Sequence, residues 1–427
     1  MALDTIFALS SGRPPAAVAV IRSSGPHAFA AAEALMGRLP PARQPVLATL
    51  RAPSSGVVID QALVLRFDGP ASATGENVVE YQCHGGRAVV DALLAALGGL
   101  PGMRLAQPGE FTRRAFTNGR IDLTEAEGLA DLLEAETESQ RRAALLLAEG
   151  GLRRQAEAWR KRLVDLSARA EAAIDYVGDE HETAADEDAL AAEARALADE
   201  LAAWLGRPRA EPLKAGLRVV VTGPPNAGKS SLVNALAESE KAIVTDIAGT
   251  TRDAIEVPMA IDGVPIVLID TAGLRASEDR VEMIGIGRAE SQMQQADVLV
   301  WLGEPATAPV HRGLFPIHAQ ADRAERGAAP NGSFAVSVVT GQGLAELATA
   351  IATAARDLLP VEGEVALNRR QASAMADAAQ ALQVAGPELV MTAEALRLAR
   401  SAFDRLSGRA GVEDMLEALF GRFCLGK

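Results

Sequence analysis

The chain has 427 residues, of which 48% are hydrophobic and 23% charged, and this composition predicts two or three folded domains. Its net charge of −14 weighs against broad, nonspecific nucleic-acid binding, which depends on neutralising phosphates. The only two cysteines, Cys83 and Cys424, are too far apart for a disulfide framework or a metal knuckle. The start lacks the basic region of a signal peptide, and no apolar run approaches the roughly 18 residues that span a bilayer. We therefore expect a cytoplasmic protein that does not enter a membrane.

The first 120 residues alternate β-like and helical runs, which predicts an α+β domain over 1–120. Val- and Ile-rich runs with Gly or Pro flanks predict strands at 15–22, 56–67 and 76–83. Alanine- and leucine-rich runs predict helices at 28–38 and 87–97. Near the end of the domain stand Arg113, Arg114 and Arg120, a local basic group that on charge alone is best interpreted as solvated surface.

Residues 121–212 are poor in Gly and Pro and carry helical periodicity. Apolar residues at 4-3-4-3 spacing predict one buried helix face: Leu152, Ala156, Trp159, Leu163, Leu166, Ala170 and Ala173. After a polar break at 178–188 the pattern returns at Leu190, Ala194, Leu197, Leu201 and Trp204. A helical sequence pattern returns over 361–427. Its main apolar positions are Met375, Leu382, Leu396, Phe403, Met415, Leu419 and Phe423. We interpret the two stretches as one discontinuous helical domain whose apolar stripes form its core.

An α/β domain over 213–360 interrupts that helical domain. It follows an expected linker at 206–216 and opens with the apolar strand 217–223. We expect a Ras-like fold with a mostly parallel sheet. Because both of its ends join helical segments, a change of shape in the inserted domain can pass to the rest of the chain.

Residues 223–230, Gly-Pro-Pro-Asn-Ala-Gly-Lys-Ser, match the phosphate-loop pattern between a strand and a helix. The glycines allow main-chain N–H groups to approach phosphates, and the start of the helix adds a favourable dipole. Lys229 is expected to neutralise the β- and γ-phosphates, and Ser230 to bind Mg²⁺. A chance match is the alternative, but the context makes it remote. We predict a nucleotide-binding site.

Two further motifs follow in the order that a GTPase switch requires. Asp-Thr-Ala-Gly at 270–273 ends an apolar strand, which places Asp270 near Mg²⁺ and the Gly273 N–H near the γ-phosphate. Between the motifs, Thr250 or Thr251 can reach Mg²⁺ only while the γ-phosphate holds its loop. Ras-type enzymes have a water-orienting Gln after this glycine, whereas this chain has Leu274.

Catalysis must therefore use another group. The candidates are Arg275, Glu282, or a monovalent cation that takes the place of an arginine finger, with the side-chain oxygen of Asn226 as one ligand.

The base-recognition motif Asn-Lys-x-Asp is altered. At its expected place stands Ala319-Gln320-Ala321-Asp322, so that Asp322 can still accept from guanine while the bracing Asn and Lys are missing. Ser337, Val338 and Val339 stand where a second loop supports the base through its backbone. We expect guanine preference with weakened affinity, and relaxed base choice remains an alternative.

The predicted GTP contacts, taken together, are Asn226, Ala227, Gly228, Lys229, Ser230, Ser231, Thr245, Asp246, Ile247, Ala248, Gly249, Thr250, Thr251, Asp270, Thr271, Ala272, Gly273, Ala319, Gln320, Ala321, Asp322, Ser337, Val338 and Val339.

With these motifs in view, the chain resembles the MnmE (TrmE) family of tRNA-modification GTPases along its whole length. The segments that carry the resemblance are Val-Ile-Arg-Ser-Ser-Gly at 20–25, the runs 74–86 and 108–127, the three GTPase motifs, and the terminal Phe-Cys-Leu-Gly-Lys. The resemblance implies an N-terminal folate-binding domain, a discontinuous helical domain and an inserted G domain. It implies a homodimer that acts with the FAD-dependent protein MnmG in a heterotetramer or larger complex. Together they would add a carboxymethylaminomethyl-type group to C5 of the wobble uridine of tRNA, with carbon from a tetrahydrofolate derivative.

The family's site residues transfer to matching positions of this sequence. Contacts to 5-formyl-tetrahydrofolate fall on Arg22, Glu80, Arg120 and Lys427. On charge alone Arg22 and Glu80 indicate only surface charges at a strand edge, and Arg120 replaces an expected lysine. The K⁺ ligands fall on Asn226, Thr245, Ile247 and Thr250, and the Mg²⁺ ligands on Ser230 and Thr251. The catalytic group would comprise Glu282, which orients the attacking water indirectly, Lys229 and Thr251.

Cys424 matches a cysteine of the family and is as consistent with a small buried hydrophobe as with a nucleophile. Two other functions remain open: a GTP-gated RNA-binding or ribosome-assembly factor without modification chemistry, and a degraded GTPase that barely hydrolyses its nucleotide. The N-terminal domain and Lys427 separate the first from a modification enzyme, because a ribosome factor needs neither.

Overall fold

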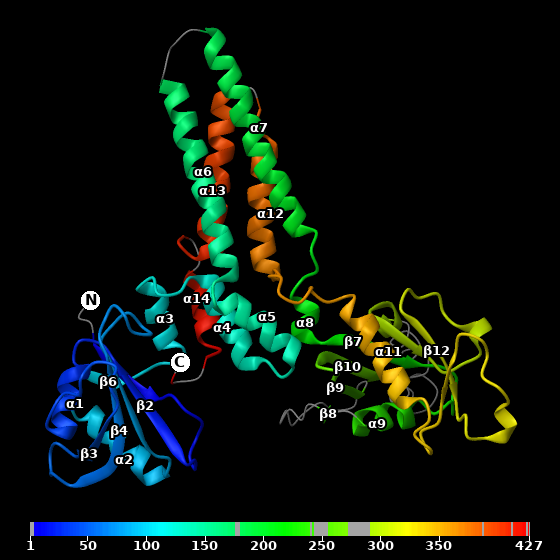
Figure 1. Cartoon of the computed structure of the whole chain (residues 1–427), viewed down its shortest axis with the longest axis horizontal. Helices are drawn as coiled ribbons and strands as arrows, with labels where there is room; N and C mark the ends of the chain where they lie inside the picture. The colour runs from blue at the N-terminus through cyan, green and yellow to red at the C-terminus, as the bar shows by residue number, and fades with distance from the viewer. Residues whose placement is uncertain are drawn as a thin grey trace, which may run out of the picture. The chain divides into compact units, whose positions relative to one another are not determined.

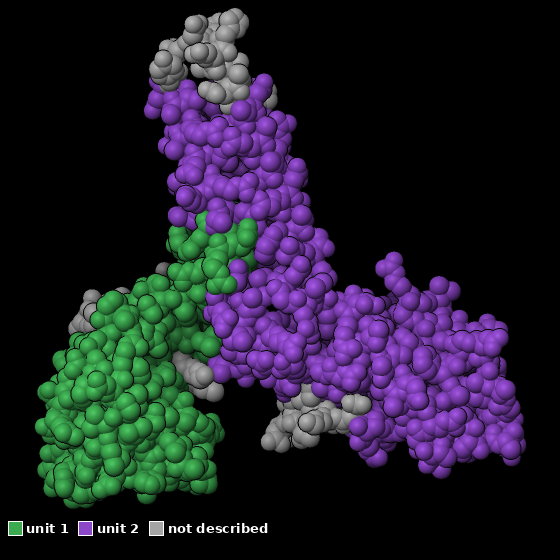
Figure 2. Space-filling model, in the orientation of Figure 1, with its two compact units in different colours: residues 1–130, 152–157, 403–427 green, residues 131–151, 158–402 purple. Residues whose placement is uncertain are grey.

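The computed structural model describes residues 4–175, 180–239, 241–242, 255–271, 291–386, 388–410, 413–423 and 426. The contacts group the chain into two compact units (Figure 2). The first unit contains residues 1–130, 152–157 and 403–427, and the second contains 131–151 and 158–402. No helix in the described part of the chain is both long and apolar enough to cross a bilayer. The domain boundaries expected from sequence stay a prediction.

A six-stranded sheet forms the body of the N-terminal domain (Figure 1). Its strands are β1 (Thr5–Leu9), β2 (Val18–Ser24), β3 (Val46–Arg51), β4 (Val58–Phe67), β5 (Val78–His84) and β6 (Met103–Leu105). They lie in the order β3-β4-β5-β2-β1-β6, antiparallel except for the β1–β6 pair. The three strands expected from sequence are confirmed to within a few residues. The other three, β1, β3 and β6, are not among the expected strands, and β3 and β6 form the two edges of the sheet.

The two faces of this sheet carry different helices. Helices α1 (Ala28–Met36) and α2 (Arg87–Gly98), both expected, share one core with Phe7 and Tyr81. Helix α3 (Glu110–Thr117) packs on the other face, where Phe111 meets Ile6 and Ala8. Side chains alternate between the faces of a strand, so Arg22, directly opposite Ala8, lies on the α3 face.

The C-terminal tail returns to the N-terminal strand. Helix α14 (Glu413–Phe420) packs against α3, and Gly426 O accepts a 2.9 Å hydrogen bond from Ser10 Oγ across 416 positions of sequence. A Cβ on Gly426 would overlap Leu9 O. The glycine is therefore what allows the tail to lie directly against the end of β1.

Long helices account for most of the helical part. They are α4 (Leu123–Glu134), α5 (Glu138–Ala148), α6 (Gly151–Asp175), α7 (Glu180–Leu205), α12 (Arg369–Gln383) and α13 (Leu389–Ser407). The predicted stripes are confirmed as core, since all but Ala173 and Trp204 of the two stripes are buried. Trp159 is fully buried, with its ring 5.1 Å from Trp204 and its Nε1 donating to Glu200 Oε1 at 2.7 Å.

The polar stretch at 178–188 interrupts the apolar stripe, yet most of it is helical. Helix α7 already begins at Glu180 and lies along α12 (Figure 1). Its first turns are rich in Ala and Glu, which are strong helix formers whatever their polarity.

The inserted domain has a seven-stranded sheet that is mostly parallel, as predicted. Its strands are β7 (Leu217–Thr222), β8 (Lys241–Ala242), β9 (Ile255–Ile261), β10 (Val264–Asp270), β11 (Val298–Trp301), β12 (Leu314–Ala319) and β13 (Phe334–Val336). They lie in the order β13-β12-β11-β7-β10-β9-β8, with the β10–β9 and β9–β8 pairs antiparallel and the other four pairs parallel. The helices α9 (Lys229–Ser239) and α11 (Leu344–Arg356) pack into one core with this sheet. The linker before it contains one short helix, α8 (Glu211–Ala215).

Two crossovers in this domain contain no α-helix. Parallel strands are normally joined through a helix. Here 302–313 joins β11 to β12, and 320–333 joins β12 to β13, each with a single 3-10 turn: η2 (Pro305–Thr307) and η3 (Ala324–Arg326). The inserted domain is thus a shortened version of the expected fold.

Candidate functional site

The loop between β7 and α9 has the backbone that phosphate binding requires. Gly223 and Gly228 have φ of +148° and +94°, in a region that residues with a Cβ rarely adopt. Asn226, at φ +61°, is one of the few other residue types that tolerate left-handed backbone. The loop follows the carboxyl end of β7 and leads into the first turn of α9. The free main-chain N–H groups of such a first turn are suited to bind an anion.

Lys229 lies across this loop with only 6% of its surface exposed. Its Nζ donates to Gly223 O at 3.2 Å and to Pro224 O at 2.8 Å. The main chain of the loop therefore holds the ammonium group in place without a bound phosphate. Its charge is positioned where negative charge on the β- and γ-phosphates would be neutralised.

The neighbouring strand delivers the second motif to the same edge of the sheet. Asp270, 2% exposed, ends β10 and pairs in register with Val221 of β7. Thr271 Oγ1 donates to Val221 O at 2.9 Å, which ties the motif to the strand that leads into the phosphate loop. The carboxylate of Asp270 and the exposed hydroxyl of Ser230 are hard oxygen ligands, the type that Mg²⁺ prefers. This donor set fits a magnesium ion.

The altered base loop is an ordered turn. Asp322 Oδ1 accepts a 2.6 Å hydrogen bond from Ser337 Oγ, and the fully buried Ser337 Oγ accepts from Thr340 N at 3.2 Å. The Ser337 hydrogen bond holds the pKa of Asp322 below its ordinary value. Arg326 Nε donates to Ala319 O at 3.1 Å and ties the other end of the turn. Asp322 is thus an oriented, ionised acceptor, suited to the adjacent N–H groups of a guanine edge.

Replacing Asp322 by asparagine tests this assignment. Asparagine directs an N–H₂ group at the guanine donors, and losing a hydrogen bond to a charged group costs about 10-fold or more in affinity. We expect GTP to lose its advantage over ATP and XTP in competition binding. Asp357→Asn, an exposed position at the end of α11, is the matched control. An unchanged guanine preference would mean that Asp322 does not read the base.

The two central folate candidates form one pair. Arg22 and Glu80 face each other on β2 and β5, and Arg22 Nε and Nη2 lie 2.9 and 2.7 Å from Glu80 Oε1. The side chains are 24% and 18% exposed, and the Arg22 guanidinium lies 5.7 Å from the ring centre of Phe111. They occupy central strands, so the interpretation as surface charges at a strand edge is wrong. The pair offers cationic donors beside an aromatic ring, a donor set that fits a folate.

Arg120, the third folate candidate, packs against Gly75. Its side chain lies over Gly75, where an added Cβ would stand 3.3 Å from Arg120 Cγ. No hydrogen bond or ion pair joins it to Arg22 or Glu80 in the part of the chain that the structure describes.

Arg114 has a role that the sequence did not reveal. Only 13% exposed, it contacts Asp4, Glu76 and Glu110 at 3.0, 3.1 and 3.2 Å. Although burial raises the pKa of the Glu110 carboxyl, hydrogen bonds from Arg104 and the Gln107 main chain outweigh it, and the pKa lies below its ordinary value. The interpretation of the three arginines as solvated surface therefore fails for Arg114. The spacing of Glu110 and Arg114, one helical turn apart, was the available signal.

The remaining site predictions cannot be placed, because they lie outside the described residues: Thr245, Asp246, Ile247, Ala248, Gly249, Thr250, Thr251, Ala272, Gly273, Leu274, Arg275, Glu282, Cys424 and Lys427. Of the base-supporting residues that are described, Val338 and Val339 are 39% and 81% exposed.

Comparisons with known proteins cover the whole chain. The family model "MnmE helical domain" matches residues 123–424, and "GTP-binding protein TrmE N-terminus" matches residues 5–120. A "tRNA modification GTPase MnmE" of Novosphingobium aromaticivorans is 52% identical over 436 residues, which cover 99% of this chain and 100% of the relative. One of Rhizorhabdus wittichii is 53% identical over 431 residues, covering 100% of this chain and 97% of the relative.

Among solved structures, the G domain of the FeoB iron transporter of T. maritima is 24% identical. It covers 33% of this chain and 98% of its own, with a TM-score of 0.25, too low to support an argument. The full-length relatives and the two family models decide the matter: the chain belongs to the MnmE family of tRNA modification GTPases.

Proposed function

We propose that the chain hydrolyses GTP with Mg²⁺ and K⁺, and that this cycle drives modification of tRNA. It would act in the cytoplasm as a homodimer, with an FAD-dependent partner of the MnmG kind. The product would be a carboxymethylaminomethyl-type group on C5 of the wobble uridine. The observation that carries the proposal is the phosphate loop, with Lys229 buried across it and Asp270 on the adjacent strand.

Phosphoryl transfer to water depends mainly on positioning and charge. Lys229 would offset the charge that develops on the phosphates, and Ser230, Asp270 and Thr251 would hold Mg²⁺, which would supply further stabilisation of that charge. Leu274 cannot orient the attacking water, so Glu282 takes that role indirectly. Asn226, in left-handed backbone within the loop, supports a K⁺ site shared with Thr245, Ile247 and Thr250.

The N-terminal domain would supply the one-carbon unit. Arg22 beside Phe111 suits an anionic, aromatic ligand such as 5-formyl-tetrahydrofolate. The bond between Ser10 and Gly426 brings the chain immediately before Lys427 to the end of β1, next to the strand that carries Arg22. This arrangement supports Lys427 as a further contact, and Arg120 as a more peripheral one.

The test is GTP turnover by the full chain in KCl against NaCl at equal ionic strength, with and without the flavoprotein partner. A cation that replaces an arginine finger stabilises charge in the transition state, so we expect KCl to raise turnover by about 10²-fold. Equal rates in the two salts would contradict the K⁺ site. Hydrolysis without any change in wobble uridine, measured by mass spectrometry of tRNA nucleosides, would favour the ribosome-assembly alternative.

A further inference from the structure

Helix α5 begins with a reciprocal cap. Gln140 N donates to Thr137 Oγ1 at 3.3 Å, and Gln140 Oε1 accepts from the main-chain N–H groups of Glu136 and Thr137, both at 2.9 Å. The side-chain oxygen of Gln140 therefore completes the first turn of its own helix. The cap uses the side-chain oxygen of Gln140 but not its side-chain NH₂ group.

The amide nitrogen of Gln140 reaches the short helix that leads into the inserted domain. Nε2 donates to Leu213 O at 3.1 Å and to Lys214 O at 3.5 Å, both in α8, which leads into β7 and the phosphate loop. One residue earlier, Ser139 N donates to Gly263 O at 3.4 Å, in the turn between β9 and β10. A single helix turn thus contacts the chain segments that lead to both phosphate-site motifs.

The second of these contacts lies at the end of a stiff hairpin. Asp262 and Gly263 have φ of +49° and +76°, the backbone of a tight hairpin turn. From that turn β9 and β10 stay in register from Val264 opposite Ile261 to Asp270 opposite Ile255. Seven residues of strand span about 20 Å. The turn and Asp270 therefore lie at opposite ends of one hydrogen-bonded β-hairpin.

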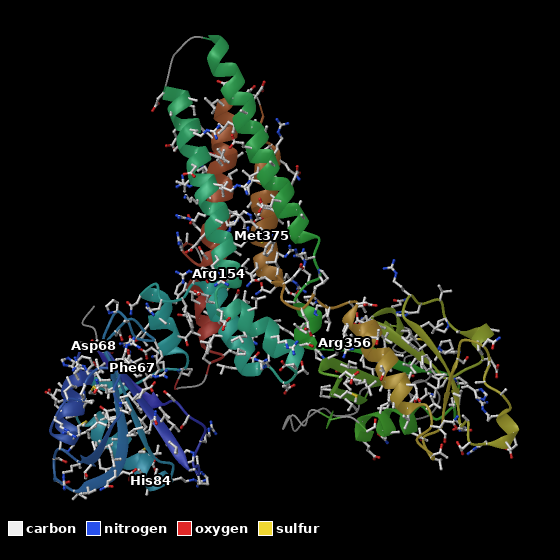
Figure 3. The ribbon with its side chains drawn as sticks, in the orientation of Figure 1. Phe67, Asp68, His84, Arg154, Arg356 and Met375 are labelled. Carbon is white, nitrogen blue, oxygen red and sulfur yellow. The ribbon has the colours of Figure 1, made fainter. Side chains whose placement is uncertain are left out.

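A further contact keeps the turn in place from within the inserted domain. Arg356, labelled in Figure 3, lies at the end of α11. Its Nη2 donates to Asp262 O at 3.0 Å. The turn is thus held between α11 and the start of α5. A shift of the hairpin at Asp270 would change the distance between Gly263 O and Ser139 N, because the paired strands move together.

We propose that Gln140 is a positioning residue that couples the nucleotide site to α5. This inference rests on the proposed GTPase function. The start of α5 responds to the phosphate site through α8 and through the hairpin turn. Only residues 135–137 separate it from α4, so the response passes directly into the preceding part of the chain. Gln140 provides the connection because one amide both caps α5 and holds α8.

Two substitutions separate the cap from the connection. Gln140→Glu keeps an oxygen acceptor at a position where Glu caps as well as Gln, but it sets a carboxylate against the carbonyls of Leu213 and Lys214. Thr137→Ala removes the cap and leaves the Nε2 donor in place. Gln383→Ala, an exposed position at the end of α12, is the matched control.

The measurement is amide hydrogen exchange over 136–142 in the full-length chain, with and without a non-hydrolysable GTP analogue. We expect nucleotide to change exchange of the wild-type segment by about 10-fold, in line with typical coupling between sites. Gln140→Glu should abolish this response while GTP turnover stays close to wild type. Thr137→Ala should exchange faster in both states and keep the response.

Tenfold lower formation of modified wobble uridine by Gln140→Glu, at unchanged GTP turnover, would support the coupling further. A wild-type response in Gln140→Glu would overturn the proposal, and so would loss of the response in Thr137→Ala alone. A chain that binds no GTP analogue overturns the proposed function as well. If amide hydrogen exchange over 136–142 responds to nucleotide but no modified tRNA is formed, the coupling stands and only the proposed role in tRNA modification is overturned.

Discussion

Lys229→Ala is expected to lower GTP turnover by about 10²- to 10³-fold, the usual cost of losing one preorganised group that stabilises transition-state charge. The ammonium is held between Gly223 O and Pro224 O inside the loop, so no solvent cation replaces it with the same geometry. Arginine should not rescue the activity. Its planar guanidinium is larger than an ammonium and cannot occupy the same buried position as a point charge.

Phosphate release from GTP at saturating nucleotide measures this effect. Lys161→Ala, which removes an exposed lysine of α6, controls for the loss of one positive charge. Lys229→Ala turnover within a few-fold of wild type would show that the loop does not hold the reacting phosphates. Lys229 would then not be the residue that stabilises charge on the phosphates.

Arg22→Ala is expected to abolish measurable binding of 5-formyl-tetrahydrofolate and to leave the affinity for GTP unchanged. Removing one partner of a hydrogen-bonded, largely desolvated charge pair costs at least about 2 kcal/mol, or about 30-fold in affinity. The loss here should be larger, because the variant also leaves Glu80 facing an anionic ligand without its guanidinium. Arg22→Lys should recover only part of the affinity, since an ammonium cannot reproduce the paired donors.

Isothermal titration with the folate, beside GTP titration of the same sample, separates the two sites. Arg51→Ala, which removes an exposed arginine of β3, is the control. Wild-type folate affinity in Arg22→Ala would refute the site. Joint loss of folate and GTP binding would indicate damage to the fold rather than to a ligand contact.

Periodicity and local motifs predicted most of the elements. The stripe from Leu152 to Ala170 is buried as expected, because a helix that repeats an apolar residue every three or four positions can bury only that face. The phosphate loop was equally clear, since its glycines, its lysine and the flanking strand and helix all lie within a few residues. The polar stretch before Leu190 is helical as well, because a run rich in Ala and Glu favours helix without an apolar face.

What the sequence by itself determined are features that depend on near neighbours: helix faces, the loop that holds Lys229, and the strand that ends at Asp270. The tertiary structure decided which distant groups meet. It set Arg22 against Glu80 in the centre of a sheet, turned Arg114 inward among three carboxylates, and gave Gln140 two partners outside its helix. It also brought Gly426 back to Ser10. The physical reason is that periodicity and backbone preference act over a few residues, whereas contacts between distant segments depend on strand register and on which helix covers which face.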